Sequence, residues 1–182
     1  MTFAPDTLLA LQSVVNLINS AESEIDGLLT LADLDVFLDR ERFTGSRAHN
    51  DSELRDVRQL RVRLRGIWES NEDEAVQLIN SILRTARALP QLVKHDDWDY
   101  HLHATTPEAP LAERMAVEAA MALVDVVRTG ELQRLRVCAG NGCRAVVLDS
   151  SRNRSRLYCN TGNCANREHV RAYRERRSQP EA

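Results

Sequence analysis

Four cysteines are the residues of this 182-residue chain whose spacing most clearly suggests chemistry. They are Cys138, Cys143, Cys159 and Cys164, and they form two pairs with the same internal spacing, C-x4-C-x15-C-x4-C. A structural zinc ion is held tetrahedrally by four such ligands, and a tight turn between paired cysteines supplies two of them. The pattern predicts one structural Zn²⁺ per chain, with every coordination position filled by a thiolate and none left for catalysis.

Two other interpretations of the cysteines compete with zinc. A thiol redox pair usually has C-x-x-C spacing, which neither pair shows. Buried cysteines without a ligand would not produce two matched spacings. Glycines inside both pairs, Gly140, Gly142 and Gly162, suit turns whose amides curl toward sulfur. The residues therefore favour zinc.

The segments between and after the two pairs must position these ligands. Residues 145–148 have strand composition, 151–154 have turn composition, and 157–158 lead back to the third cysteine. We expect a β-hairpin that joins two zinc-binding turns. Residues 165–177 should form a helix directly after the second turn. A module this small buries too little apolar surface to order itself, so metal binding should stabilise it.

Charge separates this module from the rest of the chain. The net charge is −3, but residues 1–133 carry 13 Lys and Arg against 23 Asp and Glu. Residues 134–177 carry 11 Arg against three acidic residues. A basic module attached to an acidic body is typical of a protein that binds a polyanion through the basic module. The alternative is a solvated arginine-rich tail.

Six arginines of the module are candidate DNA contacts. Three recur at i, i+4 and i+7 on the predicted helix and share one face, and three alternate in the predicted hairpin. Guanidinium groups fit phosphate oxygens and the guanine edge, and a helix fits the major groove. Double-stranded DNA is the expected partner, and the alternative is RNA or an acidic protein. The candidates are Arg152, Arg154, Arg156, Arg167, Arg171 and Arg174.

The preceding 133 residues are predicted to form a helical domain with a small β ribbon. Apolar residues recur with helical period in five stretches, and Gly130 should end the last helix. Between 91 and 104 the period changes to two, which predicts an antiparallel ribbon that pairs Leu92-Val93 with Trp98, Tyr100 and Leu102. The stretches are 6–19, the one that begins at Thr30, 52–68, 71–89 and 110–128.

Two groups of residues in this domain have both a structural and a functional interpretation. His101 and His103 could form a metal or acid/base site, but an exposed polar strand face is the favoured interpretation. Because no nucleophile–base pair or cofactor motif accompanies them, the chain is predicted not to be an enzyme, and an enzyme that uses one of these histidines is the alternative.

A second group, of five arginines, is more consistent with a solvated helix face paired with acids than with a nucleic-acid surface. It comprises Arg55, Arg58, Arg61, Arg63 and Arg65.

Cellular location and assembly follow from composition. The first thirty residues carry no Lys or Arg, so the basic flank of a secretory signal is missing, and no apolar run approaches the ~18 residues of a membrane span. We expect a cytoplasmic protein, where thiols stay reduced, without membrane association. A homodimer is expected because one small module buries little DNA-contact surface. A small-molecule effector pocket in the helical domain is a further expectation.

Several runs of the sequence resemble a known family. The CGNR zinc finger is similar to LDSSRNRSR at 148–156, CANR at 164–167 and Arg171-x-Tyr173-Arg174. Upstream, residues 15–20, the run DGLL at 26–29 and the stretch 54–68 resemble the ABATE domain that precedes this finger. The resemblance covers nearly the whole chain. It implies a stress-induced bacterial transcription regulator that binds DNA through the finger, with an N-terminal domain that senses or dimerises.

The chain departs from the family pattern at three positions. Ala165 replaces the glycine of the CGNR run, Tyr158 replaces the usual tryptophan, and His169 occupies a position that is often basic. A histidine there would make contacts depend on pH. The expected organisation is a mainly α fold with a small β ribbon, in which a helical ABATE-like domain (1–133) precedes a CGNR-type four-cysteine zinc finger built from a hairpin and a helix (134–178) and a tail (179–182).

Overall fold

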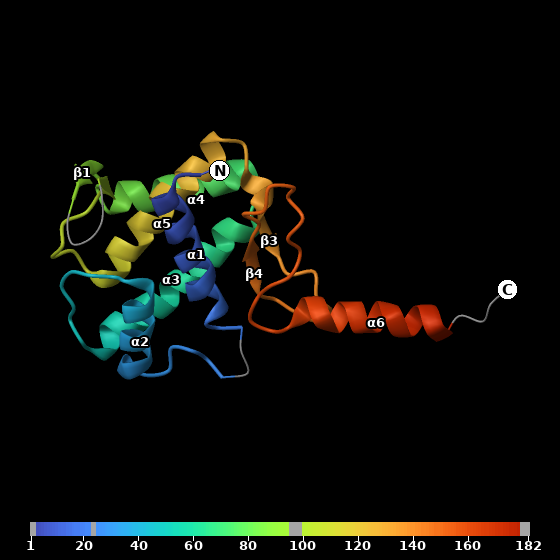
Figure 1. The fold of residues 1–182 in the computed structure, drawn as a ribbon. Coiled ribbons are helices and arrows are strands. Elements are labelled where there is room, and N and C mark those ends of the chain that lie inside the picture. Colours follow the sequence, from blue (N-terminus) through green and yellow to red (C-terminus); the bar gives the residue numbers. More distant parts are fainter. Residues whose placement is uncertain (1–2, 23–24, 95–99, 179–182) are drawn as a thin grey trace.

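The computed structural model describes residues 3–22, 25–94 and 100–178, arranged as a helical body from which one helix projects (Figure 1). Trp98 and the tail at 179–182 lie outside the described residues. The elements in chain order are α1 (Pro5–Asn19), α2 (Leu31–Glu41), α3 (Asp51–Glu69), α4 (Glu72–Thr85), β1 (Gln91–Val93), β2 (His101–His103), α5 (Leu111–Arg128), the 3₁₀ turn η1 (Leu132–Arg134), β3 (Leu135–Val137), β4 (Val146–Leu148) and α6 (Cys164–Ser178).

Capping residues set several helix ends, and the spacings Thr30-x-x-Asp33 and Asn71-x-x-Glu74 predict such caps from the sequence alone. Thr30 and Asp33 form a capping box at α2, and Asn71 and Glu74 form one at α4. At the end of α5, Gly130 adopts φ +66°, and the amide of Glu131 reaches back to the carbonyl of Val126. A glycine in this left-handed conformation satisfies the last carbonyls of a helix, so the predicted stop at Gly130 is confirmed.

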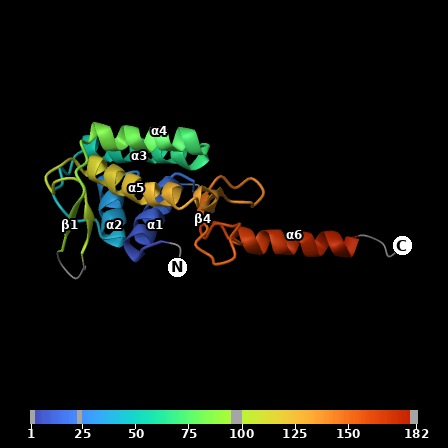
Figure 2. The same ribbon diagram turned by 90° about the horizontal axis from the view of Figure 1, so that it is seen from above.

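Helix α5 is the centre of the body and contacts α1, α3 and α4 (Figure 2). Its alanines at 116, 119, 120 and 122 are all buried. Short side chains let neighbouring helices approach closely, which is the role that the sequence suggests for them. Larger aliphatic side chains complete one core, including Leu123 of α5 itself and Leu11, Leu34 and Leu60 from the surrounding helices.

Helix α4 is shorter than predicted. It ends at Thr85, and Leu89, which the sequence places on its apolar stripe, is 71% exposed. Arg87 adopts φ +48°, which breaks the helical path before Leu89. The amide of Leu89 instead donates to the carbonyl of Ala104, beside the ribbon. The helical period of 71–89 also predicts that Leu78 is buried, but Leu78 is 42% exposed, so the predicted burial of both leucines is wrong.

Strands β1 and β2 form the predicted antiparallel ribbon, with Leu92 opposite Leu102. These two leucines are exposed, whereas His101 and His103 on the other face are half-buried. The two Nε2 atoms of the histidines lie 2.8 Å apart. The ribbon is confirmed, but the expectation that the histidine face is the exposed one is wrong.

The prediction that the arginines of α3 pair with acids is confirmed for Arg58, Arg61 and Arg65, of which Arg61 is buried, whereas Arg55 and Arg63 form no ion pair with any described residue. Arg61 donates to both carboxylate oxygens of Asp26 at 2.6 and 2.8 Å and also to Ser20. Arg65 bridges Glu22 and Glu69. A bidentate pair such as Arg61–Asp26 holds a fixed geometry, so these arginines tie Ser20, Glu22 and Asp26 to α3.

The hairpin predicted between 145–148 and 157–158 is wrong. Strand β4 instead pairs with the upstream strand β3, with Leu135 opposite Leu148 and Val137 opposite Val146. Leu135, Val146 and Leu148 belong to the core of the body, which therefore selects this pairing by burying them. Leu157 is exposed, and its carbonyl accepts the amide of Ala139.

Polar contacts reinforce the attachment of this second ribbon to the body. The Asn19 side chain donates to the Val146 carbonyl at 2.9 Å and accepts from the Val146 amide at 2.7 Å. The indole of Trp68 donates to the carbonyl of Arg136. In the described ranges, the longest apolar helices fall short of what a membrane crossing requires.

Candidate metal centre and nucleic-acid interface

The four cysteines lie close together at the N-terminal end of α6. Their Sγ atoms all lie within 4.8 Å of one another, and two of the separations, Cys143 to Cys159 and Cys159 to Cys164, are 3.7 Å. A tetrahedral zinc ion with bonds of about 2.3 Å places its sulfurs about 3.8 Å apart. The cluster therefore has the donor set and the dimensions of a four-thiolate zinc site.

Backbone hydrogen bonds and a closely packed glycine position the two thiols of the first turn, which joins Cys138 to Cys143. The amide of Cys138 donates to Ala145, which continues the β3–β4 pairing, and the amide of Cys143 closes the turn on the carbonyl of Gly140. A Cβ on Gly140 would lie 2.8 Å from the Cβ of Cys164. Only glycine fits here, because the two halves of the site approach each other at this point.

The second turn leads directly into the helix, as predicted. Asn163 adopts φ +51° and accepts the amide of Arg167, and α6 begins at Cys164. Ala165 therefore lies within the first turn of the helix and is not among the described residues with positive φ. A helical position tolerates alanine better than glycine, so Ala165 in place of the family glycine does not destabilise this turn.

Hydrogen-bond donors surround the sulfurs. Cys138 Sγ accepts the amides of Gly140 at 3.4 Å and Cys159 at 3.2 Å. Cys164 Sγ accepts the guanidinium of Arg167 at 3.1 Å. Four thiolates carry more negative charge than one divalent ion neutralises, and such donors offset the excess.

The thiols differ in acidity. Burial raises the pKa of Cys138 and raises the pKa of Cys143 to about 12. Burial also opposes ionisation of Cys159, but the Thr161 hydroxyl and the amides of Gly162 and Thr161 lower its pKa to about 6. Of these three thiols, Cys159 is therefore the one that the protein alone ionises most readily. A bound divalent cation would supply the field that ionises the others.

The loop from Asp149 to Arg156 is ordered by a buried carboxylate. Asp149 is fully buried and accepts the amides of Ser151 and Arg156, while Arg136 lies 3.3 Å away. Arg134, also buried, donates to the carbonyls of Asp149 and Ser151. These groups fix the backbone that carries Arg152 and Arg154. Sequence reasoning missed this role, because Arg134 and Arg136 look like part of the basic surface.

The six candidate arginines fall into two groups. Arg154 pairs with Glu131 at 3.0 Å, Arg167 binds the Cys164 sulfur, and Arg171 pairs with Glu168 at 2.5 Å. In the described part of the chain, Arg152, Arg156 and Arg174 have no ion pair. Arg171 and Arg174 share one side of α6 with Arg167, but three of the six guanidiniums already have a partner.

Arginines beyond the six predicted ones are also presented to solvent. Arg144 lies beside Cys143, and Arg176 and Arg177 lie in the last turns of α6, all exposed. Their only sequence signal is the clustering of arginine after residue 134, which does not separate surface from buried positions. The histidine pair of the first ribbon acquires no third ligand, because the cysteines are the one group of three or more potential metal ligands among the described residues.

Comparison with known proteins identifies both parts of the chain. The ABATE family, described as "Putative stress-induced transcription regulator", matches residues 12–130, and the CGNR zinc finger matches residues 134–177. No curated protein matches the sequence. The second match contains all four cysteines and the loop that Asp149 orders, and the first covers most of the helical body. The chain therefore belongs to the ABATE family and carries a CGNR zinc finger after its ABATE domain.

Proposed function

We propose that this protein is a zinc-dependent transcription regulator that binds double-stranded DNA in the cytoplasm. One Zn²⁺ held by Cys138, Cys143, Cys159 and Cys164 orders the finger, and exposed arginines of the finger contact the duplex. The helical domain senses a small-molecule effector and forms a homodimer. Because four thiolates leave no open coordination position, the metal has a structural role, and the protein is a binding protein and not an enzyme.

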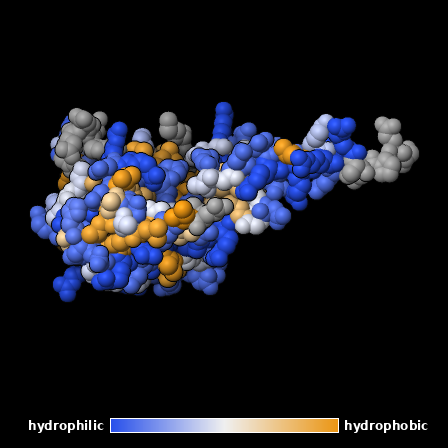
Figure 3. Space-filling view, turned by 90° about the horizontal axis from the view of Figure 1, so that it is seen from below, coloured by the Kyte–Doolittle hydropathy of each residue, from blue (hydrophilic) through white to orange (hydrophobic). Residues whose placement is uncertain are grey.

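The projection of α6 carries this proposal. The helix leaves the body at the cysteine cluster, and after its first turns no other part of the described chain covers it (Figures 1 and 2). Its surface is mostly hydrophilic (Figure 3). Fifteen residues span roughly 22 Å, which is sufficient to cross the major groove. Beyond the first turns, which carry Cys164 and Arg167, this solvated, arginine-rich helix has no stabilising role in the fold, so a partner is its most economical explanation.

The partners of each guanidinium suggest which arginines bind DNA. Arg152 and Arg174 are exposed and carry no ion pair in the described structure, so we assign them direct phosphate or base contacts. Arg167 is assigned mainly to the metal site, since it donates to a ligand sulfur. Arg154, Arg156 and Arg171 complete the interface, with Arg154 and Arg171 exchanging an acidic partner for phosphate.

The direct test is the salt dependence of DNA binding. The double variant Arg152→Ala and Arg174→Ala should bind duplex DNA more weakly, and the slope of log K against log salt should fall by about one per lost phosphate contact. Fluorescence anisotropy on duplexes made from the genomic DNA that co-purifies with the protein provides the measurement. Arg128→Ala, 76% exposed on α5, is the matched control. Equal slopes for both proteins would contradict the assignment.

A second test separates DNA contact from metal binding at Arg167. Loss of a group that orients a metal ligand commonly weakens metal binding by about 10–100-fold. Arg167→Ala should therefore lose zinc to a chelator more readily than Arg174→Ala, while Arg174→Ala affects only DNA. If both variants hold zinc equally well, Arg167 has no role at the metal.

A competition assay tests which polyanion the protein binds. Duplex DNA should displace a bound DNA probe better than structured RNA or heparin does. Stronger displacement by RNA would assign the same arginines to RNA, and equal displacement by all three would indicate a general acidic partner. Light scattering of the free protein and of the complex measures whether two chains bind one duplex.

A further inference from the structure

A groove between α3, α4 and α5 has the size and chemistry of a small-ligand site. Its volume is about 260 Å³. The floor is apolar, and three side chains that are almost fully buried, Leu60, Ile82 and Ala116, contribute to it. Polar side chains rise around this floor from all three helices. They are Asp56, Gln59 and Arg63 of α3, Thr85 of α4 and Glu113 of α5.

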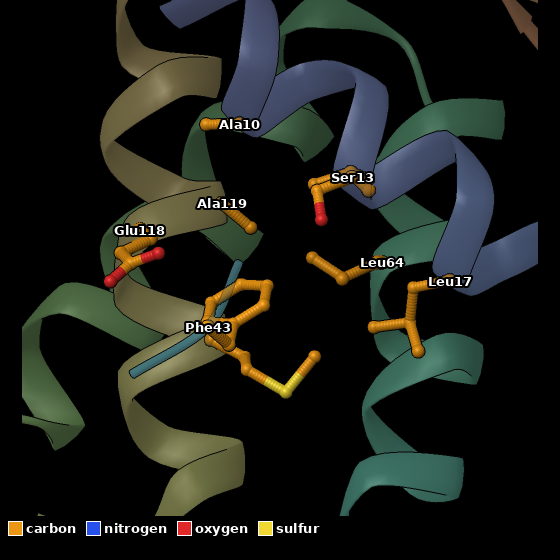
Figure 4. Close-up of a pocket in the computed structure, with 9 residues that line it drawn as sticks. Ala10, Ser13, Leu17, Phe43, Leu64, Glu118 and Ala119 are labelled. Carbon is orange, nitrogen blue, oxygen red and sulfur yellow. The ribbon is translucent and has the colours of Figure 1, made fainter. Parts of the chain in front are cut away.

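A second pocket, between α1 and α5, is too small for such a role. Ser13, Phe43 and Glu118 surround it (Figure 4), and its volume is about 20 Å³. That volume accommodates little more than one water molecule. The buried hydroxyl of Ser13 has no protein partner there, which a single solvent molecule would satisfy. The groove, with more than ten times the volume, is the better ligand site.

The charged side chains that line the groove do not form ion pairs with one another. Asp56, Arg63 and Glu113 form no ion pair in the described part of the chain, unlike Arg61 and Arg65 on the adjacent face of the same helix. Asp56, Gln59, Leu60 and Arg63 recur at i, i+3, i+4 and i+7, so one stripe of α3 forms a wall of the groove. The stripe has a carboxylate at one end, a guanidinium at the other, and an amide and a leucine between them.

We propose that this groove binds a short zwitterionic peptide with apolar side chains. Its ammonium group would lie between the carboxylates of Asp56 and Glu113, and its carboxylate would accept the guanidinium of Arg63. Residues seven apart on a helix are separated by roughly 10 Å, and the longer Arg63 side chain shortens this gap. Two extended residues span roughly 7 Å, which matches it. Gln59 would bind the peptide group, and the floor would bury the side chains.

Helix α3 also connects this groove to the zinc finger. Five residues beyond Arg63, Trp68 donates to the carbonyl of Arg136 in β3, and Arg65 donates to the carbonyl of Arg144 beside Cys143. A ligand that shifts α3 would therefore move the strand and the turn that carry two of the cysteines. This coupling, unlike the site itself, rests on the proposed DNA-binding function.

Titration calorimetry with the dipeptide alanyl-leucine tests the site on the full-length, zinc-loaded protein. The dipeptide should bind at one site per chain. Acetylation of its amine or amidation of its carboxylate should each weaken binding by about 10-fold or more, since each removes a charged hydrogen bond. Asp56→Asn and Arg63→Gln should do the same. Arg55→Gln, exposed on α3 but outside the groove, should bind as the unmodified protein does.

Two results would overturn the site. One is no binding of the dipeptide by protein whose circular dichroism and zinc content are normal. The other is equal binding of the blocked dipeptides or equal binding by Arg63→Gln. Repeating the DNA titration with saturating dipeptide tests the coupling, which predicts a changed DNA affinity. Dipeptide binding without a change in DNA affinity would refute the coupling but not the site. Failure of DNA binding with and without dipeptide would refute the proposed function alone.

Discussion

The helical body and the cysteine module are ordered by different kinds of interaction. The body has a core of aliphatic and aromatic side chains contributed by five helices and by the second ribbon. The module has a cluster of three buried cysteines with Ala145 and Val147, against which Cys143 and Tyr158 pack. Dispersion and the hydrophobic effect suffice for the body, whereas the module has little apolar surface to bury. One chain can therefore depend on a metal in only one of its two parts.

The boundary between the two lies within the second ribbon. Val146 and Leu148 face the body core, and Val147 faces the cysteine cluster, so alternate residues of β4 belong to different cores. Successive side chains of a strand point to opposite faces, which makes this sharing possible. The ribbon and the loop that Asp149 orders should therefore stay folded with the body, whereas residues 157–178 should be ordered by the metal.

Metal removal should have the largest effect, because only one of the two parts depends on the metal. Structural zinc contributes on the order of 10 kcal/mol to small modules, so a chelator or Cys159→Ser should disorder residues 157–178 while the body stays folded. Hydrogen exchange measured on both states gives the result residue by residue, and readdition of zinc should restore protection after chelation. Loss of protection in α5, or its retention in α6, would show that the two parts do not differ in this way.

A cavity in the body should have the opposite effect. Leu123 is completely buried in α5, and Leu123→Ala should destabilise the body by about 2–5 kcal/mol without changing the zinc content of the folded protein. Thermal unfolding followed by circular dichroism measures the loss. Leu78→Ala provides the control, because Leu78 is 42% exposed on α4 and should cost much less. Similar losses for both leucines would contradict the proposed core.

Asn19 tests the boundary itself. Asn19→Ala leaves the buried amide and carbonyl of Val146 without partners, which should cost about 1–3 kcal/mol. Because β4 belongs to both cores, hydrogen exchange should increase in β3 and β4 before it increases in α5. An equal increase throughout the body would mean that the ribbon is not a separate unit of opening.

The smallest expected effect is a dependence on pH that belongs to the body. Hydrogen bonds from Arg61 hold the pKa of Asp26 at about 2, below its ordinary value of about 4. The depressed pKa stabilises the fold above about pH 4, and this contribution is lost as the pH falls toward about 2. Asp26→Asn should cost about 1–2 kcal/mol at neutral pH and flatten the stability profile in that acidic range. An unchanged profile would mean that another carboxylate dominates.

Local features of this protein were predictable from sequence because neighbours along the chain create them. The capping boxes at Thr30 and Asn71, the glycine stop at Gly130 and the arginine face of α6 each depend on residues within a few positions. The cysteine spacing has the same character, since the two turns place their own ligands.

Distant pairings were not predictable in the same way. Residues 146–148 have strand composition with two possible partners, 135–137 and 157–158, and only burial of Leu135, Val146 and Leu148 against the body selects the first. Likewise, Arg134 and Arg174 are both arginines of the same basic segment, and their residue type does not distinguish a buried position from an exposed one. One is buried against the loop of Asp149 and the other is exposed, because their surroundings come from elements far apart in the sequence.

The sequence by itself determined which residues could hold a metal, where most of the helices begin and end, and that positive charge gathers after residue 134. These properties follow from residue type, short-range spacing and local hydrogen bonding. Only the tertiary structure decided which strand pairs with β4, which arginines remain available to a partner, and that α3 joins a ligand-sized groove to the zinc finger. Those outcomes depend on which surfaces are buried together, and burial is a property of the assembled chain.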